Sequence, residues 1–254
     1  MTGDEVGEPT IWSVRARNLP EHARNPIHTD SGARAAGFDA AIVAGVTVYA
    51  YLTRPVVSTW SVDWLRRGGA LVEFASPIHV NETIDCVPFV DDGNLEVQAR
   101  VVDEVRSRCT AWLTAPDVTG SASSFHAPLE SECISLVDEW DDYGRRVGDD
   151  LDLYAELGIV HPAAWPALAN CIIERQLVNG PWIHVRSRIQ HYGIAAVGAV
   201  AIVDATVVNR FDSRTGTRVV ADVSVVVDGE QVATIEHETI VTLKPVTVPR
   251  SGPS

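Results

Sequence analysis

The pattern of apolar and polar residues predicts two similar halves, each with one buried helix followed by several strands. In the first half, residues 40–52 are apolar on nearly every side of a helix, and Pro55 is expected to end it. A helix without a polar face must be covered by other elements on all sides. Turn signals separate the strands that are expected next, at residues 70–78, 82–90, 95–102 and 108–114.

The second half repeats this order of elements. His161 and Pro162 precede an apolar stretch at residues 163–177 that is expected to be helical from about Trp165. An Asp228-Gly229 pair predicts a hairpin turn within the strands that follow. These strands are expected at residues 182–191, 199–210, 218–228 and 231–243. The similarity of residues 74–78 to residues 185–189 further indicates a duplication.

The two halves define the expected domain boundaries. Residues 1–115 are predicted to form the first domain and residues 136–244 the second. Residues 116–135, which begin rich in Ser, Gly, Thr and Ala, are expected to be a linker, and residues 245–254 a disordered tail. Periodicity alone supports an α+β protein with antiparallel sheets.

Composition and charge narrow the classes of partner. The net charge of −14 argues against nucleic acid or an anionic membrane as a partner, although a local arginine patch could still bind a small anion. The N-terminus lacks the apolar core of a signal peptide, and no apolar run is long enough to span a membrane. The cysteines are scattered, which is typical of reduced, buried thiols and of a cytoplasmic protein. The single lysine, Lys244, among nineteen arginines suggests a GC-rich bacterial genome.

An Asn-Pro-x-His motif lies just ahead of the first apolar helix. It comprises Asn25, Pro26 and His28, and Gly37 and Gly45 follow it. In order and spacing, this segment resembles the active-site segment of the MaoC-like (R)-specific enoyl-CoA hydratases (hydratase 2) and dehydratases of the hotdog fold. The resemblance implies a tandem, or double, hotdog in which each half is a curved antiparallel sheet wrapped round a buried central helix. It also implies a lyase that acts on 2-enoyl or 3-hydroxyacyl thioesters.

The chemistry of that reaction assigns expected roles to three residues. His28 is the candidate general base and acid, since an imidazole can take a proton from water or from the carbon alpha to a thioester. Asn25 could position the substrate or water, or merely stabilise the turn. The backbone N–H of Gly45, at the expected start of the helix, is suited to a thioester oxygen that gains negative charge.

Two departures from the family pattern affect this assignment. The resembled proteins carry Asp where this chain has Ala23, and His where it has Ala44. Glu21 or His22 is the candidate substitute for the missing acid. The second half lacks the motif, with His161 and Pro162 in place of Ala44 and Gly45, and is expected to play a supporting role. Three further pocket candidates are Asp30, which could orient the His28 ring, Tyr49 and His184.

Several alternatives remain open at this level. The pocket could serve an isomerase, an eliminase or a cyclase of specialised metabolism, or a non-catalytic acyl-binding protein. Glu174 on the second helix would fit a thioesterase. No cofactor or metal is expected. The expected ligand is an acyl thioester of coenzyme A or of a carrier protein, held by arginines, and the chain could form homo-oligomers. The arginines considered for this are Arg66, Arg67, Arg186 and Arg188.

Overall fold

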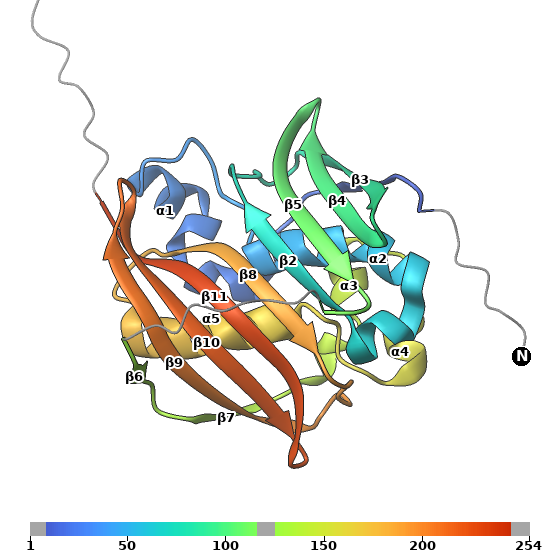
Figure 1. The fold of residues 1–254 in the computed structure, drawn as a ribbon. Helices are drawn as coiled ribbons and strands as arrows, with labels where there is room; N and C mark the ends of the chain where they lie inside the picture. Colours follow the sequence, from blue (N-terminus) through green and yellow to red (C-terminus); the bar gives the residue numbers. More distant parts are fainter. Residues whose placement is uncertain (1–8, 116–124, 245–254) are drawn as a thin grey trace, which may run out of the picture.

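The computed structural model describes residues 9–115 and 125–244, which form one continuous antiparallel sheet and two long helices (Figure 1). The sheet has 11 strands in the order β1-β3-β4-β5-β2-β8-β11-β10-β9-β6, and β7 also pairs with β9. No helix in the described ranges is long and apolar enough to cross a lipid bilayer. The predicted tail, residues 245–254, lies outside the described residues.

The strands of each half are contiguous in the sheet. Those of the first half are β1 (Trp12–Arg15), β2 (Gly69–Phe74), β3 (Thr83–Asp91), β4 (Asn94–Val101) and β5 (Glu104–Trp112). Those of the second half are β8 (Ile183–His191), β9 (Val200–Asp212), β10 (Gly216–Val227) and β11 (Glu230–Leu243). The predicted strands are therefore confirmed, with ends that differ by a few residues. Two short strands, β6 (Ala127–Pro128) and β7 (Glu132–Ser135), lie within the predicted linker and pair with β9.

The halves join through the β2–β8 pair. Val72 faces Ser187 and Glu73 faces Arg186 in its antiparallel register. On either side of this pair the strand order is equivalent, since β5, β4 and β3 extend one half and β11, β10 and β9 extend the other. Backbone hydrogen bonds thus continue across the junction, so the two halves share one sheet.

The first long helix, α2, runs from Gly45 to Arg67 and passes through Pro55. The prediction that Pro55 ends the helix is wrong. Residues from Val46 to Val57 are buried on every side except at Arg54, because sheet strands of the first half and parts of the second cover them. Burial of this apolar surface outweighs the hydrogen bond that proline removes. The kink occurs later, at Ser61, whose φ is 49°.

The second long helix, α5 (Ala164–Leu177), lies against β8, β9 and β11 (Figure 1). Each half is thus an antiparallel sheet around its own helix, the arrangement that the sequence resemblance implies. The remaining helices are short: η1 (Pro20–Arg24), η2 (Pro26–His28), α1 (Asp30–Ala35), η3 (Asp138–Trp140), α3 (Tyr143–Val147) and α4 (Leu153–Leu157). Among them, η1 and η2 position the motif beside the start of α2.

Candidate functional site

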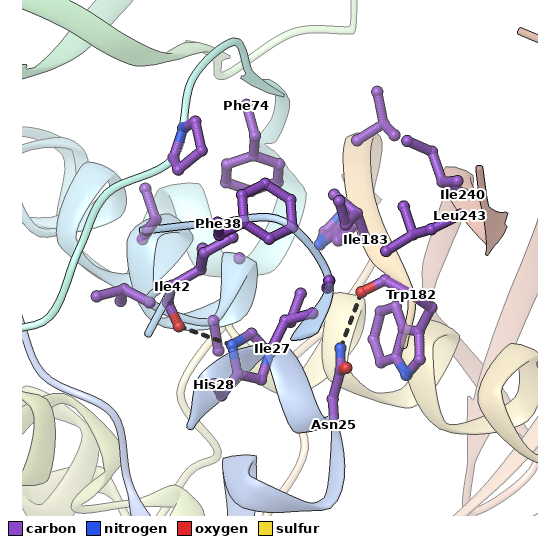
Figure 2. Close-up of a pocket in the computed structure, with 18 of the residues that line it drawn as sticks. Asn25, Ile27, His28, Phe38, Ile42, Phe74, Trp182, Ile183, Ile240 and Leu243 are labelled. Atoms are coloured by element: carbon purple, nitrogen blue, oxygen red, sulfur yellow. Dashed lines mark hydrogen bonds between the residues drawn. The ribbon is translucent and has the colours of Figure 1, made fainter. Parts of the chain in front are cut away.

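A cavity of about 510 Å³ lies between the two halves, at the N-terminal end of α2. The first half contributes η1, η2, the loop into α2 and the end of β2, and the second half contributes β8 and the β10–β11 edge. Figure 2 shows apolar side chains from both halves around it. They include Ile27, Phe38, Phe74, Ile183, Ile240 and Leu243. Such walls suit an acyl chain.

His28 lies at the end of η2 with its ring fixed by a backbone group. Its Nδ1 donates a hydrogen bond to the Ile42 carbonyl, at 2.8 Å (Figure 2). Because Nδ1 carries the proton in a neutral ring, Nε2 keeps its lone pair. Burial lowers the pKa of His28, the nearby Arg24 lowers it further, and the Ile42 bond opposes both. His28 is therefore neutral at pH 7 and has a basic nitrogen in the cavity wall.

Asn18 fixes the loop that holds this ring. Its Nδ2 donates to the carbonyls of Ile42, at 2.8 Å, and of His28, at 3.2 Å, while its Oδ1 accepts from the Ala44 N–H at 2.9 Å. One amide thus joins the motif to the residue that precedes α2. Asp30 does not perform this function: its Oδ1 accepts from the Ala41 N–H at 3.0 Å, and it does not line the cavity. The expectation that Asp30 orients His28 is wrong.

Asn25 connects the two halves across the cavity. Its Nδ2 donates to the Trp182 carbonyl at 2.9 Å (Figure 2), and only 2% of the residue is exposed. Its Oδ1 is buried and has no partner in the described part of the chain. A buried acceptor without a partner costs free energy, so this oxygen is available to a ligand hydroxyl or water.

Gly45 begins α2 with an unoccupied backbone donor. Neither its N–H nor that of Val46 meets an acceptor among the described residues, as is normal for the first turn of a helix. A Cβ at Gly45 would lie 3.0 Å from Nδ1 of His184, so glycine lets the His184 ring pack closely against the start of α2. The N–H lies at the positive end of the helix dipole, where a developing oxyanion is stabilised.

His184 belongs to β8 in the second half and lies over Gly45. Its Nε2 is 2.7 Å from the Ser187 hydroxyl, which is 2.8 Å from Nδ1 of His237. Nδ1 of His184 is buried without a partner in the described ranges. Burial and the neighbouring His237 lower the pKa of His184 well below its ordinary value, and the Arg186 backbone opposes them only in part. The ring is therefore neutral.

Neither candidate for the missing acid is free in the cavity as a proton donor. Nδ1 of His22 accepts from the Leu19 N–H at 3.1 Å, and its Nε2 is 3.3 Å from the Tyr143 hydroxyl. Burial, together with nearby His28, lowers the pKa of His22 to about 3. Glu21 binds Arg146 at 2.7 Å and does not line the cavity. Replacement of the acid by Glu21 is not supported by this position.

Two other carboxyl and hydroxyl candidates also lie elsewhere. Tyr49 is fully buried in the core, and burial raises its pKa well above the ordinary value. Glu174, the residue that would suit a thioesterase, forms an ion pair with Arg24 at 3.1 Å. Neither lines the cavity, and among the described residues that do, none is Asp or Glu. The described lining therefore contains no carboxylate that could act as an acid or nucleophile.

Comparison with known proteins identifies the fold. No protein-family model and no curated protein matches the sequence. A solved conserved hypothetical protein from Mycobacterium tuberculosis with a double hotdog fold is 10% identical with a TM-score of 0.61, covering 93% of this chain and 97% of its own. This chain has the double hotdog fold.

Other solved structures that resemble this chain carry enzyme names. A Chloroflexus aurantiacus protein provisionally described as a MaoC domain dehydratase is 11% identical, with a TM-score of 0.61 and coverage of 92% of this chain and 95% of that one. A Lactobacillus plantarum protein provisionally described as an oleoyl thioesterase is 11% identical, with a TM-score of 0.55 and coverage of 93% and 98%. At these identities the matches establish the fold only.

The basic residues at the cavity of this double hotdog differ from those that the sequence suggested. None of Arg66, Arg67, Arg186 and Arg188 lines it. The lining contains Arg24, Arg214, Arg218 and Lys244 instead. The last three lie at the β9–β10 turn, on β10 and after β11, all far from the motif in the sequence. Arg24 is paired with Glu174 and Arg218 with Glu238, so Arg214 and Lys244 are the lining cations that are better placed to bind an anionic ligand.

Proposed function

We propose that the protein is a hydratase or dehydratase of 2-enoyl or 3-hydroxyacyl thioesters. The observation that carries the proposal is the neutral His28 ring, whose Nδ1 donates to a backbone carbonyl and whose Nε2 keeps its lone pair. The unoccupied Gly45 N–H and the apolar walls supply the other requirements, an oxyanion donor and a site for the acyl chain. The motif resemblance adds support for the thioester class.

A single imidazole can complete the hydration. Nε2 of His28 removes a proton from water as the water oxygen bonds to C3 of the enoyl thioester. The electron pair of the C2–C3 double bond moves to the thioester oxygen, which the Gly45 N–H stabilises. The imidazolium then returns the proton to C2, so atoms and charge balance. Oδ1 of Asn25 accepts a hydrogen bond from the other O–H of the water, which remains as the hydroxyl on C3. Dehydration reverses these steps.

This scheme accounts for the missing acid. In the resembled enzymes an Asp shares the proton transfers, but Ala23 replaces it here. Because burial lowers the pKa of His28, its imidazolium gives up a proton more readily than an exposed one, which favours return of the proton within the same turnover. One group therefore acts as base and acid in sequence.

A second candidate is isomerisation of an enoyl thioester. It moves one proton between C4 and C2 and needs one base and an oxyanion donor. The lack of a carboxylate in the described lining favours this candidate as much as the first. The isomerase and the hydratase differ in product, since only hydration adds the mass of water.

The test is incubation of the purified protein with crotonyl-CoA, longer 2-enoyl-CoAs and their carrier-protein forms, with products identified by mass spectrometry. The proposal expects addition of water and its loss in His28→Ala, with His126→Ala as the control because His126 is exposed and does not line the cavity. A shifted double bond without added water would replace hydration by isomerisation. Tight binding without any conversion would contradict both and indicate an acyl-binding protein.

A further inference from the structure

β8 contains a bulge where it passes the cavity. His184 faces Thr239 of β11, but Arg186 faces the adjacent residue Glu238, so Val185 is the extra residue. Residues three apart in a regular strand project to opposite faces. The bulge shifts the alternation by one residue, which brings His184 and Ser187 to the same face. Bulges of this kind re-aim side chains next to active sites.

The re-aimed side chains form a continuous hydrogen-bonded chain with β11. His184 Nε2 lies 2.7 Å from the Ser187 hydroxyl, and that hydroxyl lies 2.8 Å from His237 Nδ1. The two ring centroids are 4.2 Å apart. His184 is 6% exposed, and Ser187 and His237 are 0% exposed. The outer nitrogens, Nδ1 of His184 and Nε2 of His237, have no partner in the described ranges.

A serine hydroxyl has one proton, and this couples the tautomers of the two rings. If Ser187 donates to His184, then His237 must donate to Ser187, and both rings carry their proton on Nδ1. If Ser187 donates to His237, both rings carry it on Nε2. Burial lowers the pKa of both rings, to about 3 for His237, so both remain neutral. The free His184 Nδ1 is a donor in the first arrangement and an acceptor in the second.

The position of His184 Nδ1 decides between these arrangements when a ligand is bound. It lies 3.0 Å from the place of a Cβ on Gly45, the residue whose N–H is unoccupied. Nδ1 thus packs against the residue whose N–H would hold an acyl oxygen. Because a carbonyl oxygen has lone pairs and no proton, it selects the arrangement in which Nδ1 is a donor.

We propose that His184 donates its Nδ1–H to the acyl oxygen as the second member of the oxyanion hole, and that Ser187 and His237 are positioning residues that set its tautomer. This role rests on the proposed function for the class of ligand. It assigns the second half a direct part in the site, although that half lacks the Asn-Pro-x-His motif. A neutral imidazole suits the role, because it stabilises the oxyanion without giving up its proton.

The first test compares His184→Asn with His184→Leu, which are similar in size. The asparagine amide can place an N–H where Nδ1 was, whereas leucine cannot. We expect His184→Leu to lower kcat by about 10²–10³, the usual effect of losing one such donor. His184→Asn should retain most of the wild-type kcat. Equal losses in the two variants, or wild-type kcat in His184→Leu, would overturn the proposal.

A binding measurement separates the proposed role of His184 from the proposed hydratase activity. The affinity of the protein for a saturated acyl-CoA thioester is compared with that for its thioether analogue, which lacks the carbonyl oxygen. We expect wild type and His184→Asn to prefer the thioester and His184→Leu to lose most of that preference. If wild type shows the preference but converts no enoyl-CoA, the proposed reaction fails and the oxyanion role stands. If wild type binds the two equally, the oxyanion role fails.

The tautomers can be observed directly by ¹⁵N NMR of the histidine rings with the saturated thioester bound. Both His184 and His237 are expected to carry their proton on Nδ1. Ser187→Ala should remove the coupling, so that the His237 tautomer no longer follows that of His184. Protons on Nε2 in both rings of the liganded protein, or unlike tautomers in the wild type, would contradict the proposal.

Discussion

Replacing Gly45 with alanine should abolish most activity while leaving the fold intact. The added Cβ would lie 3.0 Å from Nδ1 and 3.3 Å from Cβ of His184, closer than nearly all real Cβ contacts. His184 cannot easily move away, because Ser187 holds its ring at 2.7 Å. Overpacking of this kind costs about 1–3 kcal/mol, and the better helix propensity of alanine offsets about 1 kcal/mol of it.

The net effect of Gly45→Ala on the free energy of unfolding is thus a loss of about 0–2 kcal/mol. For a chain of this size, that lowers Tm by at most about 8 °C. The effect on catalysis is expected to be larger, because the methyl group blocks access to the Gly45 N–H. Loss of one oxyanion donor lowers kcat by about 10²–10³. Thermal unfolding by circular dichroism and steady-state kinetics with an enoyl-CoA measure the two effects separately.

The double variant Gly45→Ala/His184→Ala distinguishes strain from loss of the donor. Removing the His184 ring relieves the contact, so the stability cost of Gly45→Ala should shrink in that background. Activity should not return, because neither donor is then available. An activity of Gly45→Ala within about twofold of wild type, with unchanged Tm, would refute the assignment of this N–H as the oxyanion donor.

The remaining predictions concern buried ionisable groups. Burial raises the pKa of Asp149 to about 6, so the carboxyl destabilises the fold once the pH rises through that value and it ionises. Asp149→Asn should therefore raise the unfolding free energy by about 1–3 kcal/mol near pH 8 but little near pH 4. Equal effects at both pH values would contradict this. Burial lowers the pKa of His161 to about 3, of His191 to about 4 and of His237 to about 3. Their contribution is present above pH 6.5 and is lost as the pH falls below it, so urea unfolding should show a stability at pH 5 that is lower than at pH 7 by on the order of a few kcal/mol. An unfolding free energy that does not change between these pH values would refute the prediction.

Local patterns predicted most of the fold. Alternation of apolar and polar residues located the strands because one face of each sheet is buried. Pro55 was misleading because a local rule for helix ends does not include the packing that surrounds α2 on nearly every side. Short strands such as β6 were missed because their pairing with β9 depends on distant residues.

Some residues of the candidate site could be predicted from local sequence, and others could not. The motif predicted that Asn25, His28 and Gly45 reach the cavity, because they lie within one short stretch of chain that leads through η2 to the start of α2. Ser187 and His237 could not be found from sequence, since their contact depends on strand register and on the bulge at Val185. Two such positions carry no local signal that they belong together.

The hydrogen-bond partner of His28 could not be predicted from the sequence either. Asp30 lies two positions away in sequence, yet it begins α1, and its carboxylate binds the Ala41 N–H. The Ile42 carbonyl orients the ring instead. Proximity along the chain is a poor guide to hydrogen-bond partners where a short helix begins.

The central claim, that neutral His28 is the base, is tested most directly by the pH dependence of kcat/KM for enoyl-CoA hydration in wild type and His28→Ala. Because the base must be unprotonated, wild-type kcat/KM should fall on acidification with an apparent pKa below 6.5, as burial of His28 requires. His28→Ala should be slower by about 10²–10⁴ at neutral pH and should lack this acid limb. A wild-type rate, or an unchanged acid limb, in His28→Ala would contradict the account.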